Sequence, residues 1–342
     1  MDEMTKERRT PTILDVAKRA GVSKSTVSRV LTGSGYVGTE TRQKVEEAIA
    51  KLGYSPNRAG RMLAKQRSNI IGVMTTDRTL INPERQLGIY VLHSMQRIAN
   101  KTGYSIELFS ASGPTSPGLA AIRAGECAGY IVFEYEKCTE VVHELMERKT
   151  PFVVINRYVT EPLIHTVCAA EKYGSRLLTE HLLDHGYTCL AFFGEKSDSP
   201  VTVATQRQLG FKEALTERGI PPAQQYIITA GEQFPWLTRM KEAGIKPAII
   251  AHSDLQAMMV IKHAQRMGLR VLEDFVIGSF DNIQSGALIS PALTTVDVRW
   301  QEMGEKAVDL LLGLMDDQGT SVVSKLILKP RLVVRESCGC KG

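Results

Sequence analysis

The chain has 342 residues, of which 43% are hydrophobic and 23% charged, and a formal net charge of +5 at pH 7. This length allows two or three domains with buried cores, and the composition is that of an ordinary globular protein. The sequence has no run of about eighteen apolar residues, the N-terminal MDEMTKERRTP lacks the apolar region of a signal peptide, and the six cysteines lack the spacing of a disulfide framework. We therefore expect a cytoplasmic protein without a membrane segment.

The segment from Thr12 to Leu31 reads TILDVAKRAGVSKSTVSRVL and predicts two helices joined by a tight turn. Gly21 is suited to the left-handed residue that ends the first helix, and Ser23 is suited to cap the second. The second helix carries a row of small polar and basic residues, namely Lys24, Ser25, Thr26, Ser28 and Arg29. This spacing is typical of a helix-turn-helix whose second helix enters the DNA major groove. An ordinary helical hairpin has a similar turn but does not explain that row.

The charge of the chain is concentrated around this motif. Residues 1–68 contain fourteen Lys or Arg and seven Asp or Glu, a net charge of +7, which leaves about −2 for the remainder. A basic N-terminal fifth on a nearly neutral body is expected of a protein that binds phosphates with one end only. The following segment Glu40–Leu52 has an apolar stripe and predicts a third packing helix.

Three segments carry a family resemblance: DVAKRAGVSKSTVSRVL, YVGTETRQKV and GYSPNRAGRMLA. Across roughly the first sixty-five residues the chain resembles, without gaps, the headpiece and hinge of the LacI/GalR family of bacterial transcription regulators. The resemblance implies an all-α helix-turn-helix headpiece over residues 1–56 and a hinge helix or linker over 57–68. In that family two hinge helices fold where they meet in the minor groove.

The resemblance and the chemistry of the side chains together predict the DNA contacts. Side chains that pair with base edges are expected at Lys24, Ser25 and Arg29. Contacts to the DNA backbone are expected from Thr26, Ser28 and Asn57. The resemblance places Ala59 and Leu63 in the minor groove, with Leu63 as an apolar wedge at the central base step. A plain linker role for Leu63 remains open.

After the hinge, short apolar β-rich runs alternate with amphipathic segments of helical length. The predicted strands are Ile70–Thr75, Ser105–Ser110, Gly129–Phe133, Phe152–Asn156, Cys189–Phe193, Ala248–Ala251, Val276–Ser279 and Thr294–Val298. The predicted helices are Glu84–Lys101, Val141–Arg148, Glu171–His185, Val203–Arg218 and Asp254–Met267. This alternation predicts an α/β core of two doubly wound parallel-sheet subdomains, with helices on both faces of each sheet.

The core of the family resembles periplasmic sugar-binding proteins, which implies a discontinuous division of the effector-binding and dimerisation core, 69–342. The N-subdomain would comprise about 69–168 and 299–327, and the C-subdomain about 169–298 and 328–342. Ligands of such sheets bind beyond the carboxyl ends of the strands. The residues expected to bind the effector are Asn156, Arg207, Ser253, Asp281 and Trp300.

These residue types suit a sugar because Asp, Asn and Arg supply acceptors and donors for hydroxyl groups, and an aromatic ring packs on the apolar face. Alternatives remain open for several positions. Asp254 is equally suited to capping the next helix, Arg207 and Asp281 to a structural ion pair, and Trp300 to a core position. Several family members have Asn at the position of Ser253 and an acidic residue at that of Asn156, so the sugar itself is left open.

Enzymatic and metal-binding patterns are weak in this sequence. GVSKST lacks the spacing of a phosphate-binding loop. His181 and His185 share a helical face without the glutamate of a metalloprotease motif, and Cys338 and Cys340 form a C-x-C pair with no second ligand cluster nearby in the sequence. We therefore expect no catalysis, no cofactor and no metal.

The sequence predicts a repressor of carbohydrate catabolism genes that binds pseudopalindromic double-stranded operator DNA as a homodimer under the control of a small sugar-type effector. A phosphorylated metabolite, a purine or a protein co-effector would be compatible with the same DNA binding. The core alone would suit a small-molecule binding protein without regulation. No heptad tail follows Arg335, which favours a dimer over a tetramer joined by a coiled coil.

Overall fold

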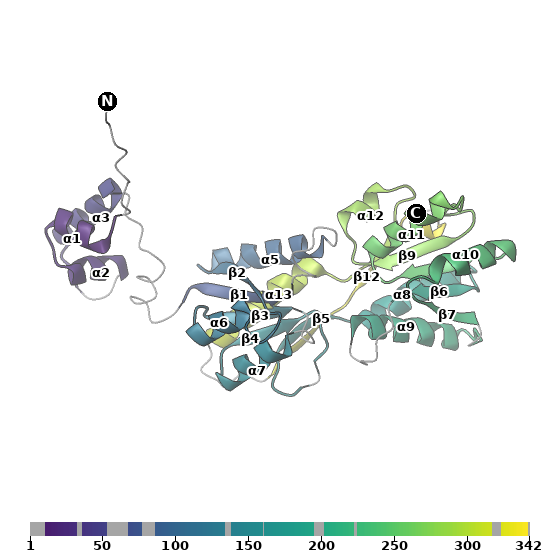
Figure 1. The fold of residues 1–342 in the computed structure, drawn as a ribbon, viewed down its shortest axis with the longest axis horizontal. Helices are drawn as coiled ribbons and strands as arrows, with labels where there is room; N and C mark the ends of the chain where they lie inside the picture. The colour runs from purple at the N-terminus through teal and green to yellow at the C-terminus, as the bar shows by residue number, and fades with distance from the viewer. Residues whose placement is uncertain are drawn as a thin grey trace, which may run out of the picture. The chain divides into compact units, whose positions relative to one another are not determined.

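The computed structural model describes residues 11–32, 36–52, 68–76, 86–133, 138–159, 161–194, 202–221, 224–316 and 323–340. The chain divides into two compact units, Met1–Ser68 and Asn69–Gly342, and each has its own hydrophobic core (Figure 1). Within the described ranges, no helix combines the length and the apolar character needed to cross a bilayer.

The first unit consists of three helices around a small apolar core. They are α1 (Ile13–Ala20), α2 (Lys24–Thr32) and α3 (Thr39–Leu52). The buried residues come from all three helices: Val16, Ala17, Val27, Val30, Val45 and Ala48. Since each helix buries only one stripe of residues, the outer face of α2 does not take part in the core.

The turn between α1 and α2 has the local geometry that the sequence predicts. Thr12 and Asp15 form a capping box at the start of α1, and Gly21 ends it with φ of 68°. The Oγ of Ser23 accepts a hydrogen bond from the backbone N of Thr26 at 3.1 Å, which confirms Ser23 as the cap of α2. These short-range bonds set the angle at which α2 leaves the turn.

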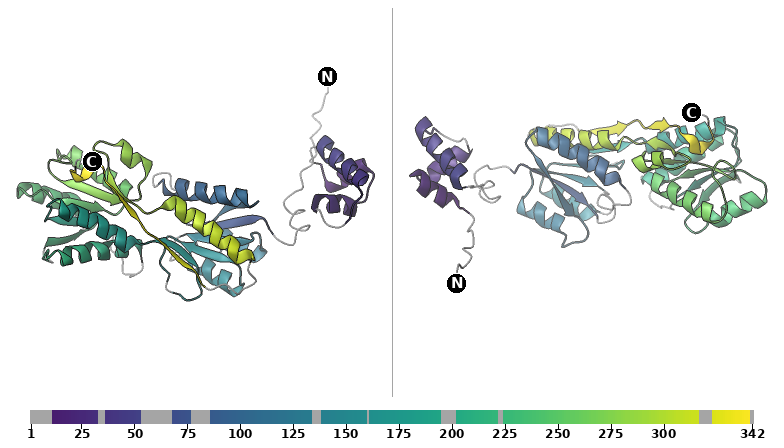
Figure 2. Two further views of the ribbon diagram at one scale, coloured as in Figure 1. Left: turned by 180° about the vertical axis from the view of Figure 1, so that it is seen from behind. Right: turned by 90° about the horizontal axis from the view of Figure 1, so that it is seen from above.

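The second unit contains two six-stranded sheets. All strand pairs of the first sheet are parallel, in the order β11-β5-β4-β3-β1-β2. Its strands are β1 (Ile70–Thr75), β2 (Ser105–Ser110), β3 (Gly129–Phe133), β4 (Phe152–Ile155), β5 (Thr166–Ala169) and β11 (Lys325–Leu328). Helices α5 (Leu87–Lys101) and α13 (Trp300–Asp316) cover one face, and α6 (Pro117–Ala124) and α7 (Thr139–Glu147) cover the other. Figure 2 shows α13 beside α5.

The second sheet has the order β12-β10-β9-β8-β6-β7. Its strands are β6 (Leu190–Phe193), β7 (Gln225–Ile228), β8 (Ala248–Ala251), β9 (Val276–Phe280), β10 (Thr294–Asp297) and β12 (Arg331–Val333). Helices α8 (Glu171–Asp184) and α9 (Val203–Glu217) cover one face, and α10 (Gln233–Glu242) and α11 (Asp254–Arg266) cover the other. The short helices α12 (Gln284–Leu288) and η3 (Glu336–Cys338) follow β9 and β12.

The chain passes between the two sheets three times. It leaves the first sheet after Ala169, returns after Asp297 and leaves again after Leu328. The third passage joins β11 to β12, drawn in yellow in Figure 2. Each subdomain is therefore assembled from segments distant in sequence, and the three connections permit one subdomain to rotate against the other.

The structure departs from the expected fold in three respects. The expected sheets were wholly parallel, but β12 pairs antiparallel with β10. Four strands were not predicted, namely β5, β7, β11 and β12. The last three are only partly buried and lack a continuous apolar run, and β5 is fully buried but only four residues long. The predicted helix from Glu84 begins at Leu87 in the described part of the chain.

Gly210 tests the close packing of α9 on α8. A Cβ at this position would lie 2.1 Å from the backbone oxygen of Lys172. Overpacking of a core typically costs 1–3 kcal/mol, so we expect Gly210→Ala to lower the free energy of unfolding by about that amount. Both tryptophans of the chain lie in the second unit, and urea unfolding followed by their fluorescence measures the change. Gly313→Ala in α13, where a Cβ meets no atom within 4 Å, is the control and is expected to be neutral or stabilising. Equal losses in the two variants would contradict this account.

Candidate functional site

The outer face of α2 brings together the five described residues of the predicted DNA contact. Lys24, Ser25 and Arg29 are exposed, and Thr26 and Ser28 are half-buried. Residues four positions apart lie one above the other on a helix, so Ser25 and Arg29 share one row of this face. We call the face formed by Lys24, Ser25, Thr26, Ser28 and Arg29 the α2 face.

Hydrogen bonds order the N-terminal end of the α2 face. The Oγ of Ser23 lies 2.7 Å from the Oγ of Ser25 and 2.8 Å from the Oγ1 of Thr26. On the opposite side of the helix Val27 is fully buried in the core. A short helix with fixed polar side chains at its N-terminal end is suited to the major groove, where such residues meet base edges. The predicted contacts at Asn57, Ala59 and Leu63 lie outside the described residues.

In the second unit, the expected effector-binding residues lie at the carboxyl ends of parallel strands. Asn156 directly follows β4 and has φ of 60°, and Asp281 directly follows β9 and has φ of 110°. Non-glycine residues held at positive φ cost energy and are concentrated at binding and catalytic sites. The positive φ angles of Asn156 and Asp281 therefore indicate a candidate binding site at the carboxyl ends of β4 and β9.

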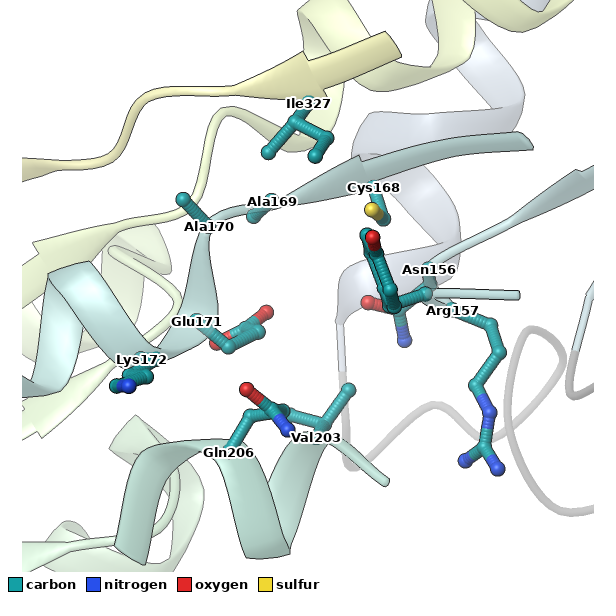
Figure 3. A pocket seen from close by; sticks show the side chains of 11 residues that line it. Asn156, Arg157, Cys168, Ala169, Ala170, Glu171, Lys172, Val203, Gln206 and Ile327 are labelled. Carbon is teal, nitrogen blue, oxygen red and sulfur yellow. The ribbon is translucent and has the colours of Figure 1, made fainter. Parts of the chain in front are cut away.

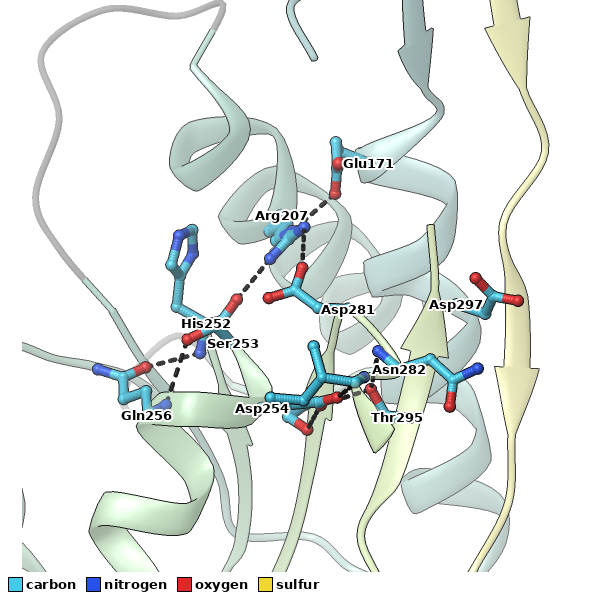
Figure 4. A network of polar contacts seen from close by, with 12 residues as sticks. Glu171, Arg207, His252, Ser253, Asp254, Gln256, Asp281, Asn282, Thr295 and Asp297 are labelled. Carbon is cyan, nitrogen blue, oxygen red and sulfur yellow. Dashed lines mark hydrogen bonds and ion pairs between the residues drawn. The ribbon is translucent and has the colours of Figure 1, made fainter. Parts of the chain in front are cut away.

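Arg207 is the centre of a buried polar network, drawn in Figure 4. Its Nε donates a hydrogen bond of 2.6 Å to the Oε2 of Glu171, and its Nη2 lies 3.5 Å from the Oδ1 of Asp281. Its Nη1 donates to the backbone oxygen of His252, and its guanidinium carbon lies 4.2 Å from the centre of the Phe280 ring. The guanidinium group thus connects α8, α9, β8 and β9 at one point.

The charges in this network are almost completely removed from solvent. The side chain of Arg207 is 3% exposed, and Asp281 is 7% exposed as a residue. Burial raises the pKa of the Asp281 carboxyl to about 7, although Arg207 lowers it and the carboxylates of Asp254 and Glu171 raise it further. A carboxyl with a raised pKa beside a fixed cation can act as a hydrogen-bond acceptor or donor near neutral pH.

Glu171 belongs to the site but was not predicted from the sequence. It is the first residue of α8 and follows β5, a strand that the sequence analysis missed. Its Oε2 accepts from Arg207, whereas its buried Oε1 has no hydrogen-bond partner among the described residues. If β5 had been recognised as a strand, the rule that ligands bind beyond strand ends would have identified Glu171.

A cavity of about 160 Å³ adjoins this network (Figure 3). Its lining includes one predicted residue, Asn156, together with Glu171 and Gln206. The remaining lining residues are Arg157, Tyr158, Cys168, Ala169, Ala170, Lys172, Val203 and Ile327. The lining combines carboxylate, amide and basic groups from both subdomains, as a polar ligand requires.

The sequence left open whether Asp254 caps α11 or belongs to the cleft, and the structure gives the capping role to Ser253. The Oγ of Ser253 caps α11 by accepting from the backbone N of Gln256 at 3.2 Å. Asp254 is fully buried and accepts from Ser279, from Thr295 at 2.6 Å and from the backbone N of Ile283 at 2.8 Å. Asp254 therefore braces the loop that carries Asp281 and does not cap α11 through its side chain.

Trp300 is part of the core and is only 5% exposed. Its ring lies 6.4 Å from the ring of Phe133, and its indole nitrogen has no hydrogen-bond partner in the described part of the chain. Of the two roles that the sequence left open for Trp300, the structure shows the core position.

Comparisons with known proteins identify both parts of the chain. Residues 12–57 match the family described as bacterial regulatory proteins, lacI family, and residues 179–338 match the periplasmic binding protein-like domain. Catabolite control protein A of Priestia megaterium is 31% identical over 336 residues, 95% of this chain and 98% of that protein. The ribose operon repressor of Halalkalibacterium halodurans is 30% identical over 341 residues, 95% of this chain and 96% of that protein.

Among solved structures, the Lac repressor dimer bound to operator and the anti-inducer ONPF has a TM-score of 0.79 at 26% identity. The match covers 96% of this chain and 99% of that one. The similar proteins regulate transcription and are not enzymes, in agreement with the prediction from the sequence.

Removal of the Arg207 guanidinium tests the buried network. Arg207→Met keeps the apolar stem but leaves the carboxylates of Glu171 and Asp281 buried and unpaired, a change that typically costs about 3–5 kcal/mol of unfolding free energy. Because the raised pKa of Asp281 means that this carboxyl is protonated at acidic pH, the folded state binds a proton that the unfolded state has released. The stability that this proton contributes is lost as pH rises through about 7.

The cost of Arg207→Met should therefore be smaller at pH 5.5 than at pH 8, as measured by urea unfolding with tryptophan fluorescence. Arg218→Met is the matched control, because Arg218 forms an exposed ion pair with Asp184 that should contribute less than about 1 kcal/mol at either pH. A cost of Arg207→Met that does not change with pH would contradict the proposed charge states.

Proposed function

Because this chain belongs to the LacI family of bacterial regulatory proteins, we propose that it represses carbohydrate catabolism genes under the control of a small sugar-type effector. It is a DNA-binding transcriptional regulator and not an enzyme. In this proposal a homodimer binds a pseudopalindromic operator, and one α2 helix reads each half-site. The place of action is the cytoplasm, where operator DNA is accessible.

The α2 face supports the proposed DNA contacts. Lys24, Ser25 and Arg29 are exposed on one helix whose other side is buried, so they can reach base edges without disturbing the core. Arg and Lys pair with the O6 and N7 atoms of guanine. Thr26, Ser28 and Asn57 would bind the DNA backbone, and Ala59 and Leu63 would enter the minor groove between the half-sites.

The observation that carries the effector proposal is the buried, unpaired carboxylate oxygen of Glu171, a residue that lines the cavity. Arg207 occupies one oxygen of Glu171 and orients Asp281, so the free Oε1 is a fixed acceptor for a hydroxyl group. Asn156 and Gln206 add amide groups that both donate and accept. Ser253 and Trp300 would contribute a hydroxyl and an indole N–H. A polyol ligand uses such paired groups.

The relatives give the sugar class further support. One is a ribose operon repressor, and a solved structure at 27% identity is the Lac repressor bound to ONPG. A phosphorylated sugar is the second candidate, because Arg157 and Lys172 also line the cavity and could neutralise a phosphate. Purines remain in the test set because several relatives at 27–28% identity are named PurR.

The coupling of the two sites follows from their connection through the chain. An effector that binds both subdomains would favour one rotation of the N-subdomain against the C-subdomain over the other. The N-subdomain continues into the hinge, so this rotation would change the separation of the two headpieces in a dimer. By thermodynamic linkage, DNA would change the affinity for the effector by the same factor.

A thermal-shift panel on the full chain tests the effector class. A ligand at a hundred times its dissociation constant stabilises the folded state by about 2.7 kcal/mol. We expect one member of a set of sugars, sugar phosphates, sugar acids and purines to raise the midpoint, and Glu171→Gln and Asp281→Asn to abolish that rise. Glu217→Gln is the control, since Glu217 forms an ion pair with Arg176 and neither residue lines the cavity. A shift that survives in Glu171→Gln would place the ligand elsewhere.

Selection of bound sequences from a random DNA pool would identify the operator sequence. Variants of the α2 face would then test whether its side chains contact the bases of that operator. We expect Arg29→Ala and Lys24→Ala each to weaken binding by about 1–3 kcal/mol and to relax the preference at one base position. Lys51→Ala in α3 is the control, because Lys51 is exposed and 3.7 Å from Glu47. If Lys51→Ala relaxes the base preference as much as Arg29→Ala does, α2 is not the reading helix.

A further inference from the structure

One cluster of reactive side chains is not used by the DNA face or by the effector site. The Nε2 of His181, near the end of α8, lies 3.4 Å from the Sγ of Cys338 and 3.3 Å from the Sγ of Cys340. The three atoms all lie within 4.8 Å of one another. The two thiols form no disulfide. His181 and the C-x-C pair are about 160 residues apart in the sequence, and the fold brings them together.

The distances are close to those of a metal site. A tetrahedral zinc ion with Zn–S bonds of about 2.3 Å and Zn–N bonds of about 2.0–2.1 Å holds adjacent sulfur and nitrogen ligands about 3.5 Å apart. The two sulfur–nitrogen distances in the structure differ from this value by only about 0.2 Å. Two thiols and one imidazole are the ligand types that zinc and related soft cations prefer.

The backbone around the cysteines is held in place before any ion binds. Ser337 donates to the backbone oxygen of Ile277 at 2.6 Å and accepts from the backbone N of Thr294 at 2.8 Å. Gly339 has φ of 79°, a left-handed conformation that reverses the chain between the two cysteines. Both sulfurs consequently lie near the same ring nitrogen.

A metal ion needs deprotonated sulfur, so its binding to the two thiols would release protons to solvent, and the affinity for the metal would rise with pH.

We propose that the Nε2 of His181 and the thiolates of Cys338 and Cys340 bind one zinc ion per chain, with water in the fourth position. The ion would join α8 to the segment that follows β12. Cys338 is fully buried and His181 is half-buried, so the site lies at the edge of the C-subdomain and not in the cleft. The proposal does not depend on which operator or effector the chain binds.

The ion would also link the two walls of the effector site. Helix α8 carries Glu171 at its first turn and His181 ten residues later, a span of about 15 Å. On the other side, the Nη2 of Arg335 donates a 2.7 Å hydrogen bond to the Oδ1 of Asn282, the neighbour of Asp281. Zinc binding would therefore restrain the two elements that hold the carboxylates around Arg207.

Metal titration of the full chain, reduced and freed of metal with a chelator, tests the proposal. We expect cobalt to give a thiolate-to-metal charge-transfer band and the visible bands of a tetrahedral site, and zinc to displace it at one equivalent per chain. Equilibrium dialysis with zinc measures the affinity, and thermal unfolding should show a higher midpoint with zinc than without it.

Variants of the partly exposed ligands identify the site. Cys340→Ser and His181→Gln should each lower zinc affinity at least tenfold and weaken the cobalt bands. Cys189→Ser and His263→Gln are matched controls, since Cys189 is a half-buried free thiol and His263 lies on the surface of α11. Tryptophan fluorescence and operator binding verify that each variant is folded. Using two independent ligands keeps the test valid if one variant is unstable.

Three results would overturn the proposal: no zinc bound above background in equilibrium dialysis, equal losses of zinc affinity in Cys189→Ser and Cys340→Ser, or a Cys338–Cys340 disulfide that persists after treatment with the reductant. The last is detected by mass spectrometry as a loss of two hydrogens. None of these results bears on effector or DNA binding, so they leave the proposed function unaffected.

Discussion

Arg207 lies with its guanidinium group sealed from solvent between Glu171 and Asp281, and the arrangement of the cleft depends on this contact. A single charge on α9 holds the first residue of α8 and the end of β9 at hydrogen-bonding or ion-pair distance. A buried ion pair contributes little net stability but strongly penalises any arrangement in which one partner is missing. The network therefore selects one geometry for the strand ends that carry the candidate site.

The other buried polar residues near Arg207 support the loops and helices around this network. Asp254 uses its two oxygens to hold Ser279, Thr295 and the backbone of Ile283, so the loop that begins at Asp281 has a fixed origin. Ser253 holds α11. With these residues in supporting roles, the buried Oε1 of Glu171 is a carboxylate oxygen of the network without a hydrogen-bond partner among the described residues. The site is a small set of free groups on a rigid frame.

Helix α8 connects this frame to the cluster formed by His181, Cys338 and Cys340. A restraint at one end of a rigid helix is transmitted to the other, so occupancy of the proposed metal site would limit the positions available to Glu171. The chain passes three times between the two sheets, and an effector that regulates DNA binding requires two arrangements of these subdomains with similar energy. In the proposed site, a bound ion that restrains α8 would change the balance between them.

The sequence by itself determined the features that depend on neighbours within a few residues. The left-handed Gly21 that ends α1, the Ser23 cap of α2 and the exposed row on α2 could all be predicted, because local hydrogen bonds and helical spacing decide them. The strands with continuous apolar runs were also predictable, and they indicated where Asn156 and Asp281 would lie. Strands with half-exposed residues, such as β11 and β12, give no such signal.

Only the tertiary structure decided which distant residues meet. Glu171 joined the site because β5, which was not recognised, delivers it to the same sheet edge as Asp281. His181 met Cys338 and Cys340 because η3 follows β12 and packs on β9, beside α8. Pairings of this kind depend on the order of strands in a sheet and on crossovers between subdomains. Long-range order of that type is set by the packing of the whole core, and no short stretch of sequence contains it.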